Sequence, residues 1–163
     1  LYVVVVFYPQ FLDGVGVDSS AAISLYLAAN GAAGGVTAVA YDRLLKRVSR
    51  LTLVGVAVGL WTIGFAGVSA VTTAVGALLP VVLFGAGIGL VFPSAFAWVE
   101  QFAPAAKQGQ FSAYLASVGY TGQFLAPVLF GPLVPGLGVA GVFAVGAAVA
   151  AVGVVTVVVA LSR

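Results

Sequence analysis

The residues of this sequence that could act on another molecule form two sets: a charged cluster, and polar side chains scattered through apolar runs. The cluster holds five of the ten charged residues, namely Asp42, Arg43, Lys46, Arg47 and Arg50. Because long apolar runs flank it on both sides, the cluster is predicted to lie in a short loop at a membrane surface, on the cytoplasmic side.

Enzymatic chemistry has few candidates in this chain. Cysteine and histidine are absent, which excludes a thiolate nucleophile, a Cys/His metal site and an imidazole general base. The sequence shows neither a pair of carboxylates nor a nucleophile beside a base. We therefore expect no enzyme activity, no catalytic residue, no metal and no cofactor. The net charge is only +2, so we interpret the basic residues as topology signals and expect no nucleic-acid partner.

Composition indicates that the lipid bilayer is the solvent of this chain. Hydrophobic residues make up 63% of the sequence and charged residues 6%, and the mean hydropathy is +1.23. Soluble domains carry roughly 25% charged residues. At about 20 residues per spanning helix, the 163 residues allow five or six spans.

An all-α fold of six transmembrane helices is predicted, because runs of 20 or more residues without turn signals favour helices over strands. The expected helices lie at about 1–12, 19–41, 51–68, 77–100, 109–130 and 139–161. The first is only about 18 Å long at 1.5 Å per residue, too short to span. We expect it to be truncated, with the chain beginning partway through a longer gene product.

Charge supports this topology. With six spans, every basic residue lies on one side and only Asp13 and Asp18 lie on the other; the basic set is Arg43, Lys46, Arg47, Arg50, Lys107 and Arg163. An excess of lysine and arginine on one side of a membrane protein is typical of its cytoplasmic loops. We expect a multi-pass integral membrane protein of a prokaryotic plasma membrane, with the basic loops and the C-terminus in the cytoplasm.

Small residues four positions apart allow helix backbones to approach closely in lipid. Three glycine pairs have this spacing: Gly31/Gly35, Gly55/Gly59 and Gly85/Gly89. They predict close helix–helix contacts.

Polar side chains inside spans are costly unless they face other helices or a water-filled cavity. Tyr26, Asn30 and Thr37 share one face of the second expected helix. On the fifth expected helix, four polar residues likewise share one face: Gln110, Tyr114, Ser117 and Thr121. Gln123 lies on a different face of that helix. Two interpretations stay open, hydrogen bonding between helices and contact with a substrate.

The charged cluster also carries a family resemblance. The run 42–47, Asp-Arg-Leu-Leu-Lys-Arg, resembles the signature between the second and third helices of each half of major facilitator superfamily transporters. That pattern reads glycine, three residues, Asp-Arg, one residue, glycine, then two basic residues. Ala38 and Leu45 replace its glycines, as in the degraded copy of the second half. Gly122 to Pro127, with Gly131, similarly resembles a degraded fifth-helix motif.

The resemblance covers essentially the whole chain and implies the C-terminal six-helix half of a secondary active transporter. It implies the missing N-terminal half and a small-molecule solute as partners, and a conformational latch at Asp42, Arg43, Lys46 and Arg47. It makes the first, second, fourth and fifth helices cavity-lining, while Trp61 faces lipid or the interface. The possible cavity residues are Tyr8, Gln10, Tyr26, Asn30, Tyr114, Ser117, Thr121 and Gln123.

Two alternatives belong to other functional classes. The chain could be a structural or assembly subunit of a membrane complex. It could also form a channel-like pore, although the sequence shows neither a ring of charges nor a filter loop.

Overall fold

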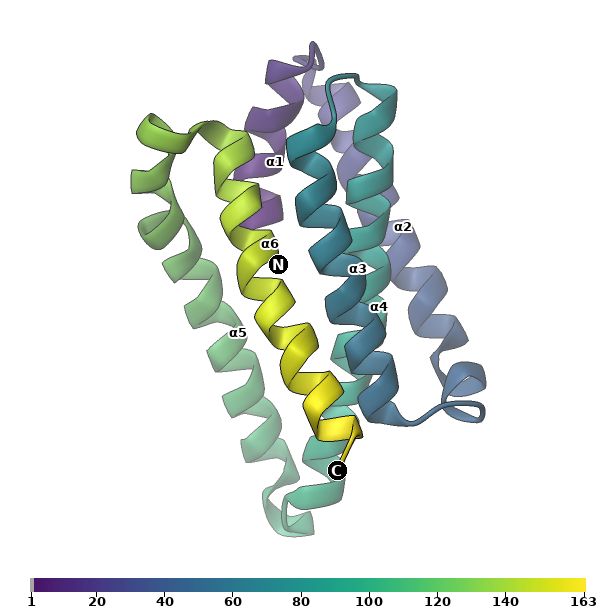
Figure 1. Ribbon diagram of the computed structural model, residues 1–163. Helices are drawn as coiled ribbons and strands as arrows, with labels where there is room; N and C mark the ends of the chain where they lie inside the picture. The colour runs from purple at the N-terminus through teal and green to yellow at the C-terminus, as the bar shows by residue number, and fades with distance from the viewer. Residues whose placement is uncertain (1) are drawn as a thin grey trace.

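The computed structural model describes residues 2–163, and these residues form helices joined by short connections, with no strand among them (Figure 1). The α-helices are α1 (Tyr2–Gly14), α2 (Ser20–Leu45), α3 (Arg50–Ala70), α4 (Leu78–Phe102), α5 (Gln108–Phe130) and α6 (Val134–Leu161). Three short 3-10 helices complete the order: η1 (Val75–Ala77), η2 (Ala105–Lys107) and η3 (Gly131–Leu133). The prediction of an all-α fold is confirmed.

Local sequence signals explain where helices begin and turn. The Ser19 and Ser49 hydroxyls each accept a hydrogen bond from a backbone N–H in the first turn of α2 or α3, at 3.1 Å, which satisfies a donor that the helix leaves unpaired. Gly16 and Gly138 have positive φ angles of 85° and 67°, a conformation that costs glycine little. Gly138 breaks the first turn of α6 from the rest of that helix.

The two ends of the bundle differ in charge. Figure 1 shows the α2–α3 turn, the α4–α5 connection and the C-terminus at one end of the bundle. The α1–α2, α3–α4 and α5–α6 connections lie at the other end. All six basic residues therefore gather at the first end, whereas Asp13 and Asp18 lie at the second.

Helix α4 occupies the centre of the helix packing, because it contacts both α2 and α3 along its length. Gly85 and Gly89 face α2: a Cβ on Gly85 would collide with the Asn30 carbonyl, and one on Gly89 with Thr37. Gly87 faces α3, where a Cβ would come within 3.0 Å of the Ala57 carbonyl oxygen. The predicted close contact at Gly85/Gly89 is confirmed.

The other two glycine pairs behave differently. A Cβ on Gly31 or Gly35 would meet no atom within 4 Å, so the prediction for this pair is wrong. Gly34 makes the contact instead, with the Gly85 carbonyl oxygen 3.1 Å from an ideal Cβ. In the third pair only Gly55 touches a neighbour, the Val157 side chain of α6. The spacing of glycines identifies a helix face that could pack closely, but the positions of the neighbouring helices determine whether that face is in contact.

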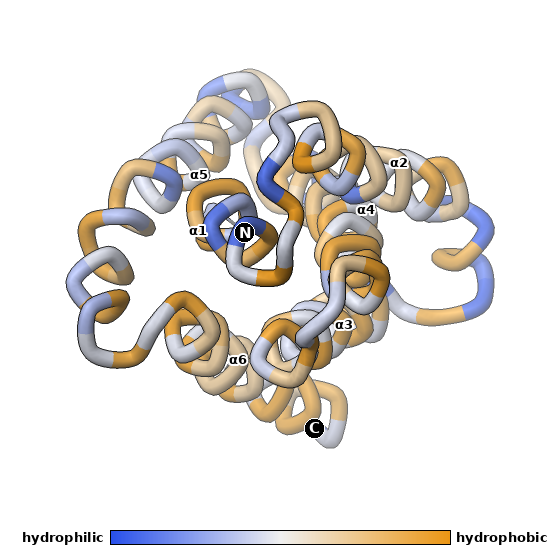
Figure 2. Tube along the Cα trace, turned by 90° about the horizontal axis from the view of Figure 1, so that it is seen from above, coloured by the Kyte–Doolittle hydropathy of each residue, from blue (hydrophilic) through white to orange (hydrophobic). Residues whose placement is uncertain are grey.

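Helix α1 lies inside a ring formed by the other helices (Figure 2). The Tyr8 ring, fully buried, belongs to an aromatic cluster whose neighbouring ring centroids are 4.7 to 6.4 Å apart. The other members are Phe11, Phe65, Phe84 and Phe143. Aromatic rings at these separations add to the stabilisation that burial gives.

Helix α5 is the exception to this packing. Ala126 is the only residue of α5 that is buried. Figure 1 shows α5 running along the outside of the bundle, and its contacts with α1 and α4 are sparse beside those between α2 and α4. The bundle therefore contains a tightly packed group, α2, α3, α4 and α6, and a loosely held α5.

The glycine contacts can be tested by substitution. We expect Gly89→Ala to destabilise the fold by about 1–3 kcal/mol, the usual cost of forcing extra carbon into a packed site. Gly31→Ala is the matched control, because its Cβ enters open space and alanine favours helix by about 1 kcal/mol over glycine. Reversible unfolding in mixed micelles measures both. A Gly89→Ala variant as stable as Gly31→Ala would contradict the contact.

Candidate functional site

Four polar side chains of α2 point toward α4 and make hydrogen bonds across the interface. Their spacing of four, seven and four residues places them on one helix face. The donor–acceptor distances are 2.7 Å for Tyr26 Oη to Ala74 O, 2.9 Å for Asn30 Nδ2 to Val81 O, 3.0 Å for Thr37 Oγ1 to Ala86 O, and 3.0 Å between the Tyr41 and Ser94 hydroxyls. Most acceptors are backbone carbonyls, so these bonds join α2 to the backbone of α4 and the turn before it.

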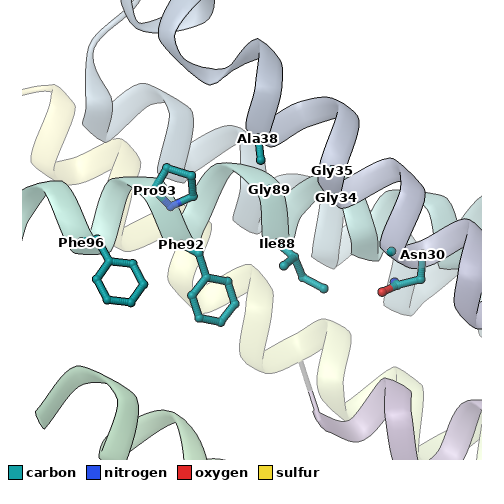
Figure 3. A pocket seen from close by; sticks show the side chains of 10 residues that line it. Asn30, Gly34, Gly35, Ala38, Ile88, Gly89, Phe92, Pro93 and Phe96 are labelled. Carbon is teal, nitrogen blue, oxygen red and sulfur yellow. The ribbon is translucent and has the colours of Figure 1, made fainter. Parts of the chain in front are cut away.

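Asn30 also lines a hollow between α2 and α4 of about 440 Å³ (Figure 3). Gly31, Gly35 and Ala38 form the α2 side, and their small size leaves the space open. The α4 side is formed by Ile88, Gly89, Phe92, Pro93 and Phe96. Asn30 lies at one end of the hollow and Phe96 at the other. The amide is the single polar side chain of an otherwise apolar surface.

Of the two α1 candidates, Tyr8 is fully buried and Gln10 is exposed. The Tyr8 hydroxyl donates to the Ala77 carbonyl of η1, close in sequence to the carbonyl that Tyr26 uses. Both tyrosines therefore tether the connection between α3 and α4. The Gln10 amide reaches only the carbonyl of Val6, at 3.5 Å.

The α5 candidates form a separate group on the exposed surface. The Gln110 amide donates to the Tyr114 hydroxyl at 2.6 Å, and the Ser117 and Thr121 hydroxyls donate to carbonyls of their own helix at 2.8 and 2.9 Å. Tyr114, Ser117, Thr121 and Gln123 are all exposed. The eight predicted cavity residues therefore do not converge on one site within this chain. Tyr8, Tyr26 and Asn30 lie against α4 and the connection before it, whereas Gln10 and the α5 members are exposed.

The predicted latch lies at the exposed end of α2. That helix continues to Leu45, four residues beyond its predicted end, so Asp42 and Arg43 belong to its last turn and Lys46 and Arg47 to the turn that follows. All four side chains are exposed. Within residues 2–163 the Asp42 carboxylate makes no ion pair or hydrogen bond with another side chain. Arg43 lies where a cation favours the helix dipole.

Trp61, which is expected to face lipid or the interface, is half-buried and contacts α4. Its indole Nε1 donates to the Phe84 carbonyl oxygen at 3.1 Å, and the side chain lines two apolar hollows of about 540 and 500 Å³ beside α5. Sequence reasoning missed this cleft. A signal was present, because Ala57, Trp61, Gly64, Phe65 and Val68 follow the helical spacing of a single apolar face.

Metal ligands do not gather anywhere in the part of the chain that the structure describes. Within residues 2–163, no three side chains among histidine, cysteine, aspartate and glutamate lie close enough together to hold a metal ion. The polar chemistry of the bundle therefore consists of hydroxyl and amide groups on its helices, with charge at its ends.

Comparison with known proteins gave no further identification. No protein-family model, curated protein or solved structure matches this chain. The assignment of a function therefore depends on the geometry of the helices and of their polar side chains.

Proposed function

We propose that this chain is a multi-pass membrane protein and one half of a secondary active transporter that moves a small solute by alternating access. Four helical stretches are long and apolar enough to cross a membrane: Ser20–Leu45, Arg50–Ala70, Val75–Phe102 and Ala105–Leu161. The last of these runs through α5 and α6, between which the chain reverses direction (Figure 1). Charges gathered at the bundle ends are compatible with insertion.

The exposed polar face of α5 is the observation that carries this proposal. Tyr114 is 55% exposed, and Ser117, Thr121 and Gln123 are exposed with it. Polar side chains at membrane depth avoid lipid and face protein or water. A solute path between this chain and a second half gives α5 such an environment, with hydroxyl and amide groups that can bind an uncharged polar solute.

The division between packed and loose helices suits movement around such a path. Glycine contacts and cross-helix hydrogen bonds hold α2, α3 and α4 together, and α6 packs against α3. In alternating access, one rigid bundle rocks against its partner around a fixed central site. A packed group that moves as a unit and a less constrained α5 beside the solute meet both requirements.

The exposed charges at the end of α2 give the second half a place to latch. Asp42 has no partner among the side chains of residues 2–163, so its carboxylate is available to an arginine or a helix N-terminus of the partner. Arg43, Lys46 and Arg47 surround it in sequence. We propose that this contact closes one side of the transporter and opens as the halves rock.

A structural or assembly subunit is the second candidate, and the α2 hydrogen bonds favour it. Asn30 and Thr37 use their polar groups to hold α4, and Tyr26 holds the connection before it. A subunit that only packs needs nothing more. The exposed face of α5 would then meet protein instead of solute.

Topology provides the first test of this proposal. The chain contains no cysteine, so single cysteines report their own location. We expect Ser49→Cys and Lys107→Cys to react with a membrane-impermeant maleimide only from the cytoplasmic side, and Asp18→Cys only from outside. Intact and inverted vesicles distinguish the sides. Labelling of Ser49→Cys and Asp18→Cys from the same side would contradict the topology.

Transport itself tests the role of the α5 face. Replacing Tyr114 by Phe, Ser117 by Ala and Thr121 by Val together removes three hydroxyls that are exposed in this chain. We expect uptake by the assembled transporter to fall at least about tenfold, since three lost solute hydrogen bonds, each worth about 0.5–1.5 kcal/mol, together cost at least about 1.5 kcal/mol. The measurement is uptake of labelled sugars, nucleosides and amino acids into expressing cells.

The control for the α5 variant is Thr156→Val, which removes an exposed hydroxyl that bonds to its own helix on α6. Normal assembly with unchanged uptake in the α5 variant would favour the assembly subunit. Loss of assembly with the partner would do the same.

Substitution of Asn30 distinguishes a packing role for the polar residues of α2 from a role in solute contact. If its amide serves only the 2.9 Å bond to Val81, Asn30→Ala should lower the free energy of unfolding by about 0.6 kcal/mol, the average for such bonds in membranes. Uptake per folded molecule should then stay unchanged. Gln10→Ala is the control, since Gln10 is exposed and weakly bonded. A rise in KM without a change in stability would assign Asn30 to the solute.

A further inference from the structure

A shallow hollow of about 490 Å³ runs along the outward face of α2 and ends at a cation. Its lining comes from α2 alone: Ala32, Gly35, Val36, Val39, Ala40 and Arg43. These positions follow one another at helical spacing, so they share one face of the helix. All of them except Ala40 are exposed. The hollow therefore joins an apolar floor to a single guanidinium group at its C-terminal end.

The position of Arg43 suits an anion at the end of this floor. Its side chain lines the hollow, and long basic side chains lay their stems on apolar surface while the charged head stays in the polar layer. Among residues 2–163, the guanidinium makes no ion pair and no hydrogen bond with another side chain. The neighbouring Asp42 projects about 100° further around the helix, away from this face. The cation at the end of the hollow is therefore available to a ligand.

Two more cations extend the positive charge beyond the hollow. Lys46 and Arg47 follow Arg43 by three and four positions and are exposed. Lys46 keeps α-helical backbone angles as the C-cap of α2. Figure 2 shows the hydrophilic turn after α2 at the outer edge of the bundle. Basic residues placed directly after a spanning helix attract anionic lipid headgroups.

We propose that this hollow binds an acyl chain of an anionic phospholipid whose phosphate is held by Arg43, with Lys46 and Arg47 beside it. The length of the hollow agrees with this ligand. From position 32 to position 43 the helix rises about 17 Å at 1.5 Å per residue, and one leaflet is about 15 Å deep, half of a hydrocarbon core of about 30 Å. This inference rests on the proposed insertion of the chain in a membrane.

An apolar floor and an unpaired cation together select the ligand. A zwitterionic phospholipid can fill the floor, but its phosphate is already paired with its own ammonium group. Inorganic phosphate can meet the cation, but it leaves the floor empty. A helix of another protein would bury the Arg43 charge and would need a carboxylate at that point to compensate it. Phosphatidylglycerol supplies both an acyl chain and an unpaired negative charge.

Gly35 is the position at which the hollow can be filled by substitution. A Cβ on Gly35 would meet no atom within 4 Å, so a larger side chain there enters open space. Gly35 also lines the hollow between α2 and α4, where the second chain of the same lipid can lie. Gly35→Leu therefore obstructs the proposed lipid site from a point that contacts no other helix.

Fluorescence quenching tests the proposal in the full chain, which contains no cysteine. Leu44→Cys, next to Arg43 and outside the hollow, carries a bimane label in nonionic micelles. The quenchers are phosphatidylglycerol and phosphatidylcholine with a nitroxide on one chain close to the headgroup. We expect phosphatidylglycerol to reach half-maximal quenching at a concentration at least about fivefold lower, the factor that corresponds to about 1 kcal/mol of attraction for one basic residue.

Two matched pairs of variants assign this preference to the hollow and its cation. Arg43→Gln should lower the preference for phosphatidylglycerol about fivefold, whereas Lys107→Gln, which removes a cation from the other connection at the same end, should keep it. Gly35→Leu should lose the preference, because the headgroup is held only where the chain has room. Gly59→Leu should keep it, since its first carbon also meets open space but lies outside the hollow.

Equal quenching by the two lipids in the labelled chain would overturn the proposal and would favour a partner helix as the occupant of this face. An equal loss in Lys107→Gln would do the same, because the whole basic end would then attract the lipid. A preference retained in Gly35→Leu would show that charge acts without the hollow. Displacement of the lipid by inorganic phosphate at a similar concentration would assign the cation to a free anion.

Circular dichroism and gel filtration show whether each variant is folded, and the Gly35→Leu pair tests the site even if Arg43→Gln misfolds. None of these readings depends on transport. If the loop cysteines react from the expected sides and the two lipids quench equally, the lipid site alone fails. If the lipid preference is present and no uptake is found, the transporter proposal alone fails.

Discussion

The close approach of the α4 backbone to α2 on one side and α3 on the other is the constraint on which the bundle depends. Gly85 and Gly89 face α2, and Gly87 faces α3. Residues two positions apart on a helix point about 200° apart, so a glycine at every second position removes side chains from two opposite faces at once. Both neighbouring helices can therefore pack closely against the α4 backbone, and α6 packs against α3.

This backbone contact and the polar bonds of α2 depend on each other. In the bilayer that we propose for this chain, apolar side chains would gain little by meeting other helices, so van der Waals fit and hydrogen bonds would hold the helices together. The Asn30 amide and the Thr37 hydroxyl reach carbonyls of α4 only because Gly34, Gly85 and Gly89 let the two backbones come close. Glycine contacts set the distance between the helices, and the hydrogen bonds set their register.

Sequence reasoning located the helices better than it located their faces. Long apolar runs broken by glycine, proline and charge indicate where a helix can exist, and the expected ends lie within a few residues of most observed ones. Gly31/Gly35 and Gly85/Gly89 share one spacing, yet only the second pair is in contact, because contact also depends on the partner helix. Tyr8 and Tyr114 are the same residue type, fully buried and 55% exposed respectively. Their surroundings come from segments distant in sequence, which periodicity cannot reveal.

The polar groups of α2 and α5 differ in whether they are free to bind another molecule. On α2 the hydroxyl and amide groups are bound to α4 and to the connection before it, and their use for another molecule would require breaking a packed interface. On α5 similar groups are exposed and bonded only within their own helix. A serine or threonine hydroxyl that donates to its own helix still has lone pairs to accept with. The face of α5 can therefore bind a hydrogen-bond donor without any cost to the packing that holds the other helices.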